Sequence, residues 1–430
     1  MSKIITMIKS LRYIDFSFFK KNNPISKIRK QWGKEKIKKR NFNLISIYHD
    51  LIKKDNNHQY IDDTTWNDLN MDSIFSKIDR NISSIGSQFL YNLLHQYEKD
   101  NKVRSNRYAQ YQYFLNNKEI RERIQIILSK LQHQNAHYIP KLIFKKLPKK
   151  PKYYFLFCIL SISMISSMIL VFFKSVFLLI IPIIAVINIS INYLYGRNIT
   201  GYIVNLSNLS RLLKVGNKLS ELNIGLPQIE KLSKLKEFSI ALNKKLGWLT
   251  TNSVNFNEML DILVDYLNYF CLFNVISFVR SIEHIRSNQN KLKMIYEAIG
   301  SLDANIAISS YIRSLPYYCR PKIVNENIIN TKEIYHPLLE DPVSNNFDIQ
   351  DKSVLITGSN MAGKTTFMKT IGINIILSRS LSFCFAKEAI LPKLVVKTSI
   401  KRSDDIDDNK SYYFKEIESI NQFLKMSSEQ

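Results

Sequence analysis

The sequence predicts a mostly α-helical protein that also contains a C-terminal α/β domain. Apolar residues recur at three- and four-residue steps along much of the chain. Glycine and proline are scarce, with 11 of each among 430 residues, which favours long helices over a compact sheet. Two uncharged apolar stretches, Tyr153–Phe173 and Ser175–Tyr195, lie in the middle of the chain. Near the C-terminus the β-branched run Ser353–Thr357 leads through glycine into a helical pattern, Thr365–Ser380, which is typical of an α/β unit.

The charge balance is strongly basic, with 61 Lys and Arg against 36 Asp and Glu and a formal net charge of +25. Such an excess favours polyanionic partners, either nucleic acid or the anionic face of a membrane. Residues 20–41 form the densest basic run and include Trp32. We interpret this run as a solvated arm, and contact with lipid headgroups or nucleic acid is the alternative.

The four cysteines, Cys158, Cys271, Cys319 and Cys384, are far apart and form no C-x-x-C pair. This spacing fits a reducing compartment and argues against a disulfide framework or a zinc site. His133 and His137 have metal-ligand spacing, but Gln134 stands where the general base of a zinc protease would be, so we expect no metal there. The four aspartates of the run 404–408 are expected to form a solvated turn. The apolar run before Lys9 is too short for a signal peptide.

The first helical region covers roughly residues 60–132. An amphipathic stripe runs through Ile74, Ile78, Ile85, Leu90 and Leu94, and a second helical run covers Ala109–Leu131. Stripes of this kind normally mean that helices pack on helices.

The two apolar stretches in the middle of the chain predict a transmembrane hairpin. Each is about 20 residues long, which is enough to cross a hydrocarbon core of about 30 Å. Lys174 divides them, and basic residues lie outside both ends, at Lys145, Lys146, Lys149, Lys150, Lys152 and Arg197. The positive-inside rule then places both soluble parts in the cytoplasm and the turn Phe173–Ser175 outside. A hydrophobic core hairpin in a soluble protein and a single re-entrant segment are the alternatives.

Beyond the hairpin, helices are expected at 199–223, 227–245 and 255–313. The segment Asn223-Ile-Gly-Leu-Pro227 separates the first two of them.

The segment Gly358-Ser359-Asn360-Met361-Ala362-Gly363-Lys364-Thr365 fits the pattern G-x-x-x-x-G-K-[ST] without a mismatch. Glycines let successive backbone N–H groups point at phosphate oxygens, and the N-terminus of the following helix adds its positive end. Lys364 then reaches the β- and γ-phosphates, and the Thr365 hydroxyl binds Mg²⁺. The required context, an apolar strand before the loop and a helix after it, is also present. The sequence therefore predicts a P-loop that binds ATP or GTP.

The longer segment Ile356-Thr-Gly-Ser-Asn-Met-Ala-Gly-Lys-Thr-Thr366 resembles the phosphate loop of the MutS family, TG-x-NM-x-GK-[ST]-[ST]. The Asn360-Met361 pair separates that family from most P-loop ATPases. Tyr335-His-Pro-Leu-Leu339 resembles the family's strand ahead of the loop, where His336 is expected to be a packed or capping residue. The resemblance implies ATP with Mg²⁺ as ligand, Thr366 as part of the site, pairing of two P-loop domains in a homodimer, and double-stranded DNA as a partner.

The resemblance extends beyond the loop. Ile78-Asp-Arg-Asn-Ile-Ser-Ser-Ile-Gly86 resembles the opening of the MutS core domain, and Ile299-Gly-Ser-Leu-Asp303 with Cys319-Arg-Pro321 resembles its end. Arg402-Ser-Asp-Asp405 and Ser411-Tyr-Tyr-Phe-Lys-Glu416 resemble the stretch whose serine reaches the nucleotide of the partner subunit. On that match Ser411 is the trans-acting residue and Glu416 is its structural neighbour.

Three departures from the family qualify what is carried over. The first 60 residues leave no room for a mismatch-reading domain with its Phe-x-Glu wedge, and the apolar hairpin indicates a membrane-bound branch. No apolar run ending in Asp-Glu, the Walker B element, occurs between the loop and Gln430. We therefore expect a chain truncated before Walker B that binds ATP without efficient hydrolysis, and no catalytic residue is identified.

The predicted organisation has five parts: a basic N-terminal arm (1–59), the first part of a helical core (60–150), a transmembrane hairpin (151–197), a long-helix lever region (198–321) and a partial P-loop domain (322–430). The favoured function is that of a membrane-anchored MutS-like ATPase in which nucleotide binding moves the long helices and DNA is a partner. The alternatives are an ATP-binding, non-hydrolysing membrane scaffold or transporter-associated subunit, and a decayed fragment.

Overall fold

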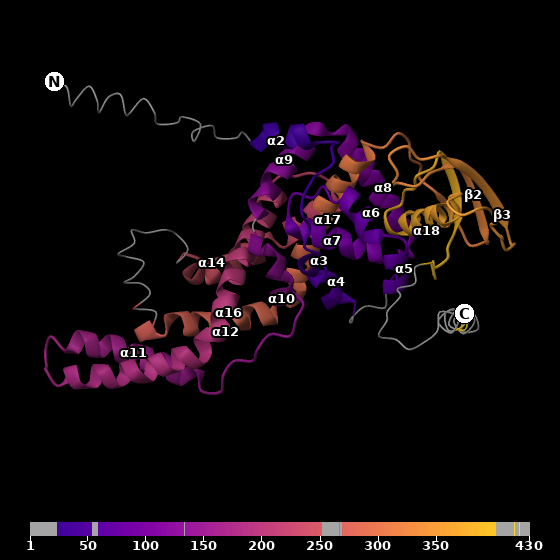
Figure 1. Cartoon of the computed structure of the whole chain (residues 1–430). Helices are drawn as coiled ribbons and strands as arrows, with labels where there is room; N and C mark the ends of the chain where they lie inside the picture. Colours follow the sequence, from indigo (N-terminus) through magenta and orange to yellow (C-terminus); the bar gives the residue numbers. More distant parts are fainter. Residues whose placement is uncertain are drawn as a thin grey trace, which may run out of the picture.

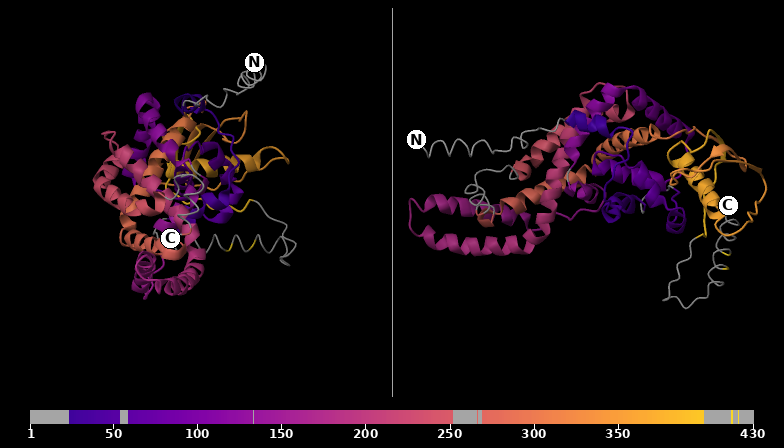
Figure 2. Two further views of the ribbon diagram at one scale, coloured as in Figure 1. Left: turned by 90° about the vertical axis from the view of Figure 1, so that its left-hand side faces the viewer. Right: turned by 45° about the horizontal axis from the view of Figure 1, so that its top comes forward.

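The computed structural model describes residues 24–53, 59–132, 134–251, 266, 269–400, 417 and 421. The protein is mostly helical with one small mixed sheet (Figure 1). It is elongated, with an apolar pair of helices at one end, a helical core in the middle and the sheet at the other end (Figures 1 and 2).

The helical core contains most of the elements. In chain order, its first part consists of α2 (Pro24–Gln31), α3 (Phe42–Ile45), α4 (Ile47–Ile52), α5 (Asp63–Asp68), α6 (Met71–Ile78), α7 (Ser84–His95), α8 (Asn101–Asn116), α9 (Lys118–Leu128), the 3₁₀ turns η3 (Ser129–Leu131) and η4 (Gln134–Tyr138), and α10 (Ile139–Ile143). The helices after it are α11 (Tyr154–Leu170), α12 (Phe177–Ser220), α13 (Pro227–Lys234), α14 (Lys236–Thr251), α16 (Phe273–Ser287) and α17 (Gln289–Ile312). The helical prediction for 60–132 is confirmed.

The contact between α7 and α17 joins the two parts of the core. Ser83 caps α7 by accepting a hydrogen bond from the Gly86 amide at 3.1 Å. The buried carboxylate of Asp303 on α17 accepts three more, from the Ile82 amide (3.1 Å), the Ser83 amide (2.8 Å) and the Ser83 hydroxyl (2.6 Å). Burial raises the pKa of this carboxyl, while the three donors act against that rise. Residues far apart in sequence are thereby held at one helix end.

Two glycines make this close approach feasible. A Cβ on Gly86 would lie 2.4 Å from an Asp303 carboxylate oxygen, and one on Gly300 would lie 2.8 Å from the Phe89 side chain. Both glycines fall in segments that resemble the opening and the end of the MutS core, and the structure brings these two segments together.

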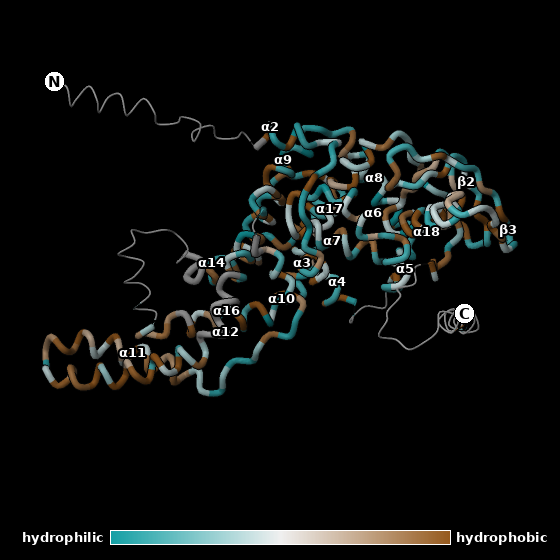
Figure 3. The backbone as a smooth tube through the Cα atoms, viewed as in Figure 1, coloured by the Kyte–Doolittle hydropathy of each residue, from teal (hydrophilic) through white to brown (hydrophobic). Residues whose placement is uncertain are grey.

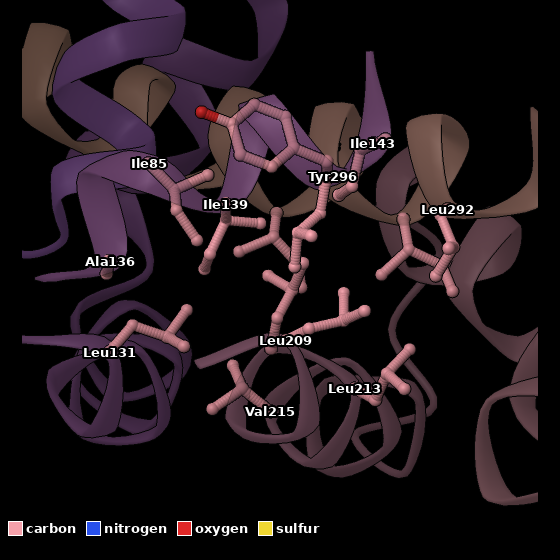
Figure 4. Packing of buried hydrophobic residues seen from close by; sticks show 14 of the residues in the cluster. Ile85, Leu131, Ala136, Ile139, Ile143, Leu209, Leu213, Val215, Leu292 and Tyr296 are labelled. Carbon is pink, nitrogen blue, oxygen red and sulfur yellow. The ribbon is translucent and has the colours of Figure 1, made fainter. Parts of the chain in front are cut away.

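The main core cluster lies where α7, η3, η4, α10, α12 and α17 meet. Figure 4 shows its side chains pointing toward one another from these elements, among them Ile85, Leu131, Ala136, Ile139, Ile143, Leu209, Leu213, Val215, Leu292 and Tyr296. The Tyr296 hydroxyl donates to the Gln88 side chain at 2.7 Å, so this buried hydroxyl is paired. The second half of α12 is therefore a core element.

The predicted separate helices 175–195 and 199–223 are one helix, α12, which is 44 residues long. Pro182 lies inside this helix, but it is close to the N-terminal end, and most of the helix lies after it. Neither Gly196 nor Gly201 breaks the helix. The expected break before Pro227 is confirmed, because α12 ends at Ser220 and α13 begins at Pro227.

The helix α11 and the first part of α12 lie side by side as an apolar hairpin that projects from the core (Figures 1 and 2), and most residues of this hairpin are hydrophobic (Figure 3). Among the described residues one helical stretch, Phe177–Tyr195, is long and apolar enough to cross a membrane, with a mean hydropathy of 2.3, and 11% of that window is buried. The 17 residues of α11 fall short of the same length. A core helix of a soluble protein would be mostly buried, and this window is not.

The described part of the predicted N-terminal arm packs on the core, which corrects its interpretation as a solvated arm. Arg29 forms an ion pair with Glu122 at 2.9 Å, and Arg40 forms one with the buried Asp79 at 3.1 Å. Trp32 lies 3.6 Å from the Arg121 guanidinium. In the sequence alone, basic residues that pair with distant buried acids cannot be distinguished from basic residues that are free in solvent.

The predicted long helix 255–313 is also corrected. Residues 252–265 lie outside the described residues, and the remainder divides at Asn288 into α16 and α17. The Asn288 side chain donates to the His284 carbonyl at 3.0 Å, so an asparagine that bonds to the backbone ends the helix where no glycine or proline marks a break.

The sheet has the strand order β1-β4-β2-β3, made of β1 (Lys322–Val324), β2 (Ile328–Ile334), β3 (Asn345–Gln350) and β4 (Glu388–Pro392). β1 pairs parallel to β4, and β2 pairs antiparallel to both β4 and β3. The helix α18 (Lys364–Ser380) packs against this sheet.

Two strand predictions are wrong. Tyr335–Leu339 follows β2 as a turn, because Pro337 has no N–H to donate to a ladder. Ser353–Thr357 pairs with no strand among the described residues, and Val354 and Leu355 are 51% and 88% exposed. A β-branched run becomes a strand only where a neighbouring strand accepts its hydrogen bonds.

We expect the substitution Asp303→Ala to lower the free energy of unfolding by about 3 kcal/mol, because it leaves three buried donors unpaired. Urea unfolding of the detergent-solubilised chain, followed by circular dichroism, measures this change. Asp341→Ala removes an exposed carboxylate and is the matched control. Equal midpoints for the two variants would show that the Asp303 carboxylate does not hold the core together.

Candidate phosphate-binding site

The loop 358–363, which the sequence predicts to bind phosphate, contains three residues with positive φ. Gly358, Met361 and Gly363 have positive φ angles of 150°, 67° and 85°. Gly363 is the N-cap of α18, so the amides that open this helix lie at the end of the loop. A Cβ on Gly363 would meet nothing within 4 Å, so a side chain would fit there. Glycine is favoured at this position because of its positive φ angle. The predicted loop residues Ser359, Asn360 and Ala362 are exposed beside it.

Lys364 holds the loop closed. Its Nζ donates to the Gly358 carbonyl and to the Ser359 carbonyl, both at 2.6 Å. These bonds use two of the three N–H groups of the ammonium. The positive charge therefore already lies among the backbone groups that would surround a phosphate, and it needs no large movement to reach one.

The two threonines after the lysine have different environments. Thr365 is exposed on the first turn of α18, where its hydroxyl can bind a cation that accompanies a phosphate. Thr366 is half-buried, and its carbonyl accepts a bond from the Thr370 hydroxyl at 2.7 Å. Among the described residues there is no group of three or more His, Cys, Asp or Glu side chains that could hold a metal ion. Thr365 is the one residue for which the sequence predicts contact with Mg²⁺, and that contact stays a prediction.

A hollow of about 590 Å³ lies beside the loop, between the sheet and α18. Its walls are largely apolar and include Phe347 from β3 and Phe367 from α18, whose rings pack edge to face at 5.3 Å. None of the residues 358–366 lines it. The lining of the hollow is therefore distinct from the phosphate loop.

The helix that carries the loop is clamped by polar residues that the sequence analysis did not single out. Asn374 donates to the Thr370 carbonyl at 2.8 Å and accepts from the Phe385 amide at 2.6 Å. Arg379 is buried, donates to the Leu394 carbonyl at 2.6 Å and lies 4.8 Å from the Tyr97 ring of the core. The signal in the sequence was an asparagine and an arginine within the apolar pattern of a predicted helix.

The chain beyond β4 is tied to the core by α5 and by Asp62, the residue that caps its N-terminus. Asp68 accepts from the Thr398 hydroxyl at 2.8 Å and from the Ile400 amide at 2.7 Å, and Lys397 donates to Asp62 at 2.9 Å. The predicted trans-acting Ser411, its neighbour Glu416 and the segments 402–405 and 404–408 lie outside the described residues.

The histidines behave as structural residues where they are described. His336 is buried, which confirms the packed role expected for it, and its Nδ1 accepts from the Leu338 amide at 3.3 Å within the turn. Burial lowers the pKa of His137 to about 4. His133 lies outside the described residues.

The similarity to known proteins includes the loop. The family model for MutS domain V matches residues 354–430. The DNA mismatch repair protein MutS of Leuconostoc mesenteroides is 29% identical over 160 residues, which are 35% of this chain and 19% of that protein. The proteins of the same name from Leuconostoc citreum and Leptospira interrogans are 30% and 33% identical over 161 and 152 residues, covering 18% of each relative. The matched part of this chain spans less than a fifth of these curated relatives.

We expect Asn374→Ala to loosen the attachment of α18 to the chain at Phe385, because the buried Phe385 amide loses its acceptor at a cost of about 2 kcal/mol. Hydrogen–deuterium exchange of a peptide covering 383–390 should become faster. Met368→Ala, on the exposed side of the same helix, is the control and should leave that exchange unchanged. Slow exchange in both variants would mean that another group holds this amide.

Proposed function

Because this chain belongs to the MutS family, we propose that it binds Mg-ATP at residues 358–366 while its apolar hairpin anchors it in a membrane. The observation that carries the proposal is a phosphate loop with the family's Asn360-Met361 pair, whose Gly363 caps α18 and whose Lys364 lies inside the turn. Nucleotide binding is the step that these residues are equipped to perform.

The roles of the loop residues follow from their positions. The backbone amides of 359–364, including those at the N-terminus of α18, would donate hydrogen bonds to the phosphates, and Lys364 would donate to their outer oxygens. The Thr365 hydroxyl would contribute one ligand to Mg²⁺, which neutralises phosphate charge when bound. Hydrolysis would also need a carboxylate to position water. An ATP-binding, non-hydrolysing scaffold remains the alternative proposal.

Pairing of two P-loop domains is the second element of the proposal. Val354, Leu355 and Met361 are 51%, 88% and 105% exposed around the loop, and apolar side chains at such levels favour a covering partner. In a homodimer of the family's kind, Ser411 would reach the nucleotide held by the partner. Double-stranded DNA is proposed as a further partner on the formal net charge of +25 and on the mismatch-repair relatives.

Several features of the hairpin support membrane anchoring. Leu179, Ile183 and Val186 are 73%, 63% and 64% exposed on α12, a surface that water would not favour. The hydroxyls of Ser163, Ser166 and Ser190 donate to carbonyls of their own helices, as polar groups in a bilayer must. We propose that α11 and α12 form a two-helix anchor with both soluble parts in the cytoplasm.

The nucleotide proposal predicts that Lys364→Ala weakens Mg-ATP binding between about 10- and 100-fold, because a charged hydrogen-bond donor to phosphate is lost. Calorimetric titration of the detergent-solubilised full chain measures the affinity. Lys393→Ala, which removes an exposed lysine beyond the loop, should bind as the unchanged protein does. Equal affinity in the two variants would place the nucleotide elsewhere.

The anchor predicts an orientation that cysteine labelling can test in cells. In a background without the native cysteines, Lys174→Cys at the hairpin turn should react with a membrane-impermeant maleimide in intact cells. Lys146→Cys on the core side should react only after lysis. Labelling of Lys146→Cys in intact cells, or protection of Lys174→Cys, would overturn the topology. Extraction by alkaline carbonate would overturn the anchor itself.

A further inference from the structure

A groove lies at the base of the hairpin, where the chain enters α11 and where α12 passes α16. Its volume is about 360 Å³. The connection before α11 forms one side with Lys149 and Lys150, α12 contributes Tyr195, and α16 forms the other side with Phe278, Ile282 and Arg286. The groove therefore lies next to the base of the hairpin.

The two sides of the groove differ in chemistry. The α16 side offers Phe278, Val279 and Ile282, and an apolar chain can pack against them. The rim carries Lys149, Lys150 and Arg286. An amphiphile with a negatively charged headgroup could place its apolar chain against this wall and its headgroup beside the cationic rim.

The cations of the rim are not fully neutralised. Glu283 is the one carboxylate among the described residues paired with them, and it is shared: Lys150 Nζ lies 3.7 Å from it and Arg286 Nη2 lies 3.9 Å from it. Neither distance is that of a direct hydrogen bond. Lys150 also lies 4.2 Å from the Tyr154 ring. Three positive charges around one carboxylate leave a net attraction for an anion at this place.

The position of the groove along the hairpin identifies the source of the anion. Four tyrosines lie at this end of the apolar stretches: Tyr153, Tyr154, Tyr193 and Tyr195. Tyrosine rings favour the headgroup layer of a bilayer. If the hairpin spans a membrane as proposed, the rim lies at the level of the phosphates of the cytoplasmic leaflet. Basic pockets at this level bind anionic headgroups.

We propose that the groove binds one anionic phospholipid of the surrounding bilayer, and this inference rests on the proposed membrane anchor. The phosphate lies among Lys149, Lys150 and Arg286, and the first part of an acyl chain lies along Phe278 and Ile282. A free anion would leave the apolar side exposed to water. A peptide would find no strand edge to pair with, because helices and a connecting segment form the groove.

The test uses the full chain reconstituted in phosphatidylcholine vesicles that contain a minor fraction of phosphatidylglycerol. After mild solubilisation, native mass spectrometry counts the lipids that stay bound. The unchanged protein should retain one phosphatidylglycerol in preference to phosphatidylcholine. The triple variant Lys149→Gln, Lys150→Gln, Arg286→Gln should retain it about 100-fold less, since each of the three lost cations contributes on the order of 1 kcal/mol near a membrane surface.

The matched control removes three exposed lysines far from the hairpin, through Lys99→Gln, Lys234→Gln and Lys322→Gln. This variant should retain phosphatidylglycerol as the unchanged protein does. An equal loss in both triple variants would show that net charge, and not the groove, selects the lipid. Release of phosphatidylglycerol by inorganic phosphate would show an anion site without lipid specificity. Either result overturns the inference.

Two further readouts separate this inference from the anchor on which it rests. Flotation of the unchanged protein with pure phosphatidylcholine vesicles after a carbonate wash reports the anchor alone. Flotation without preference for phosphatidylglycerol overturns the groove and leaves the anchor standing, whereas failure to float overturns both. Unchanged Mg-ATP binding by the rim variant shows that its fold is intact.

Discussion

The arrangement of the core depends on one contact, in which the buried carboxylate of Asp303 on α17 accepts hydrogen bonds from the start of α7. Asp303 binds the N-terminal end of α7 to α17 through hydrogen bonds from Ser83. Both helices contribute side chains to the two largest hydrophobic clusters. The cluster that includes Ile299 and Leu302 packs on α12, and the one that includes Ala304 and Ile308 packs toward α18. A single helix pair thus positions the hairpin on one side and the phosphate loop on the other.

The phosphate loop is connected to this core by polar contacts more than by its sheet. Asn374 and Arg379 hold α18 in place, Tyr97 accepts from the Val396 amide at 3.1 Å, and Asp68 holds the chain at Thr398 and Ile400. A Cβ on Gly372 would lie 3.2 Å from the Leu69 side chain, so α18 also packs closely on the core. Phosphate bound at the N-terminus of α18 would therefore act on a helix that is in direct contact with the core.

Local patterns predicted the features that depend on neighbours in sequence. The stripe through Ile74 and Leu94, the break before Pro227 and the glycine-containing loop that leads into a helix after Gly363 are of this kind, and the structure contains each of them. Features that depend on distant partners could not be predicted in the same way. Arg40 reads as a free charge until Asp79 is placed beside it, and Val354 reads as a strand residue until the neighbouring strands are known. The break at Asn288 depends on one side-chain hydrogen bond that no periodicity reveals.

The continuity of α12 gives its two halves a shared helical phase. The exposed apolar face around Ile183 and Val186 and the buried residues Leu206, Leu209 and Leu213 belong to one rod without a hinge between them. Inserting one residue between Tyr195 and Leu206 would turn one half against the other by about 100°, whereas inserting seven would nearly restore the phase and lengthen the rod by about 10.5 Å. The number of residues in that interval, more than their identity, therefore determines which face of the hairpin looks away from the core.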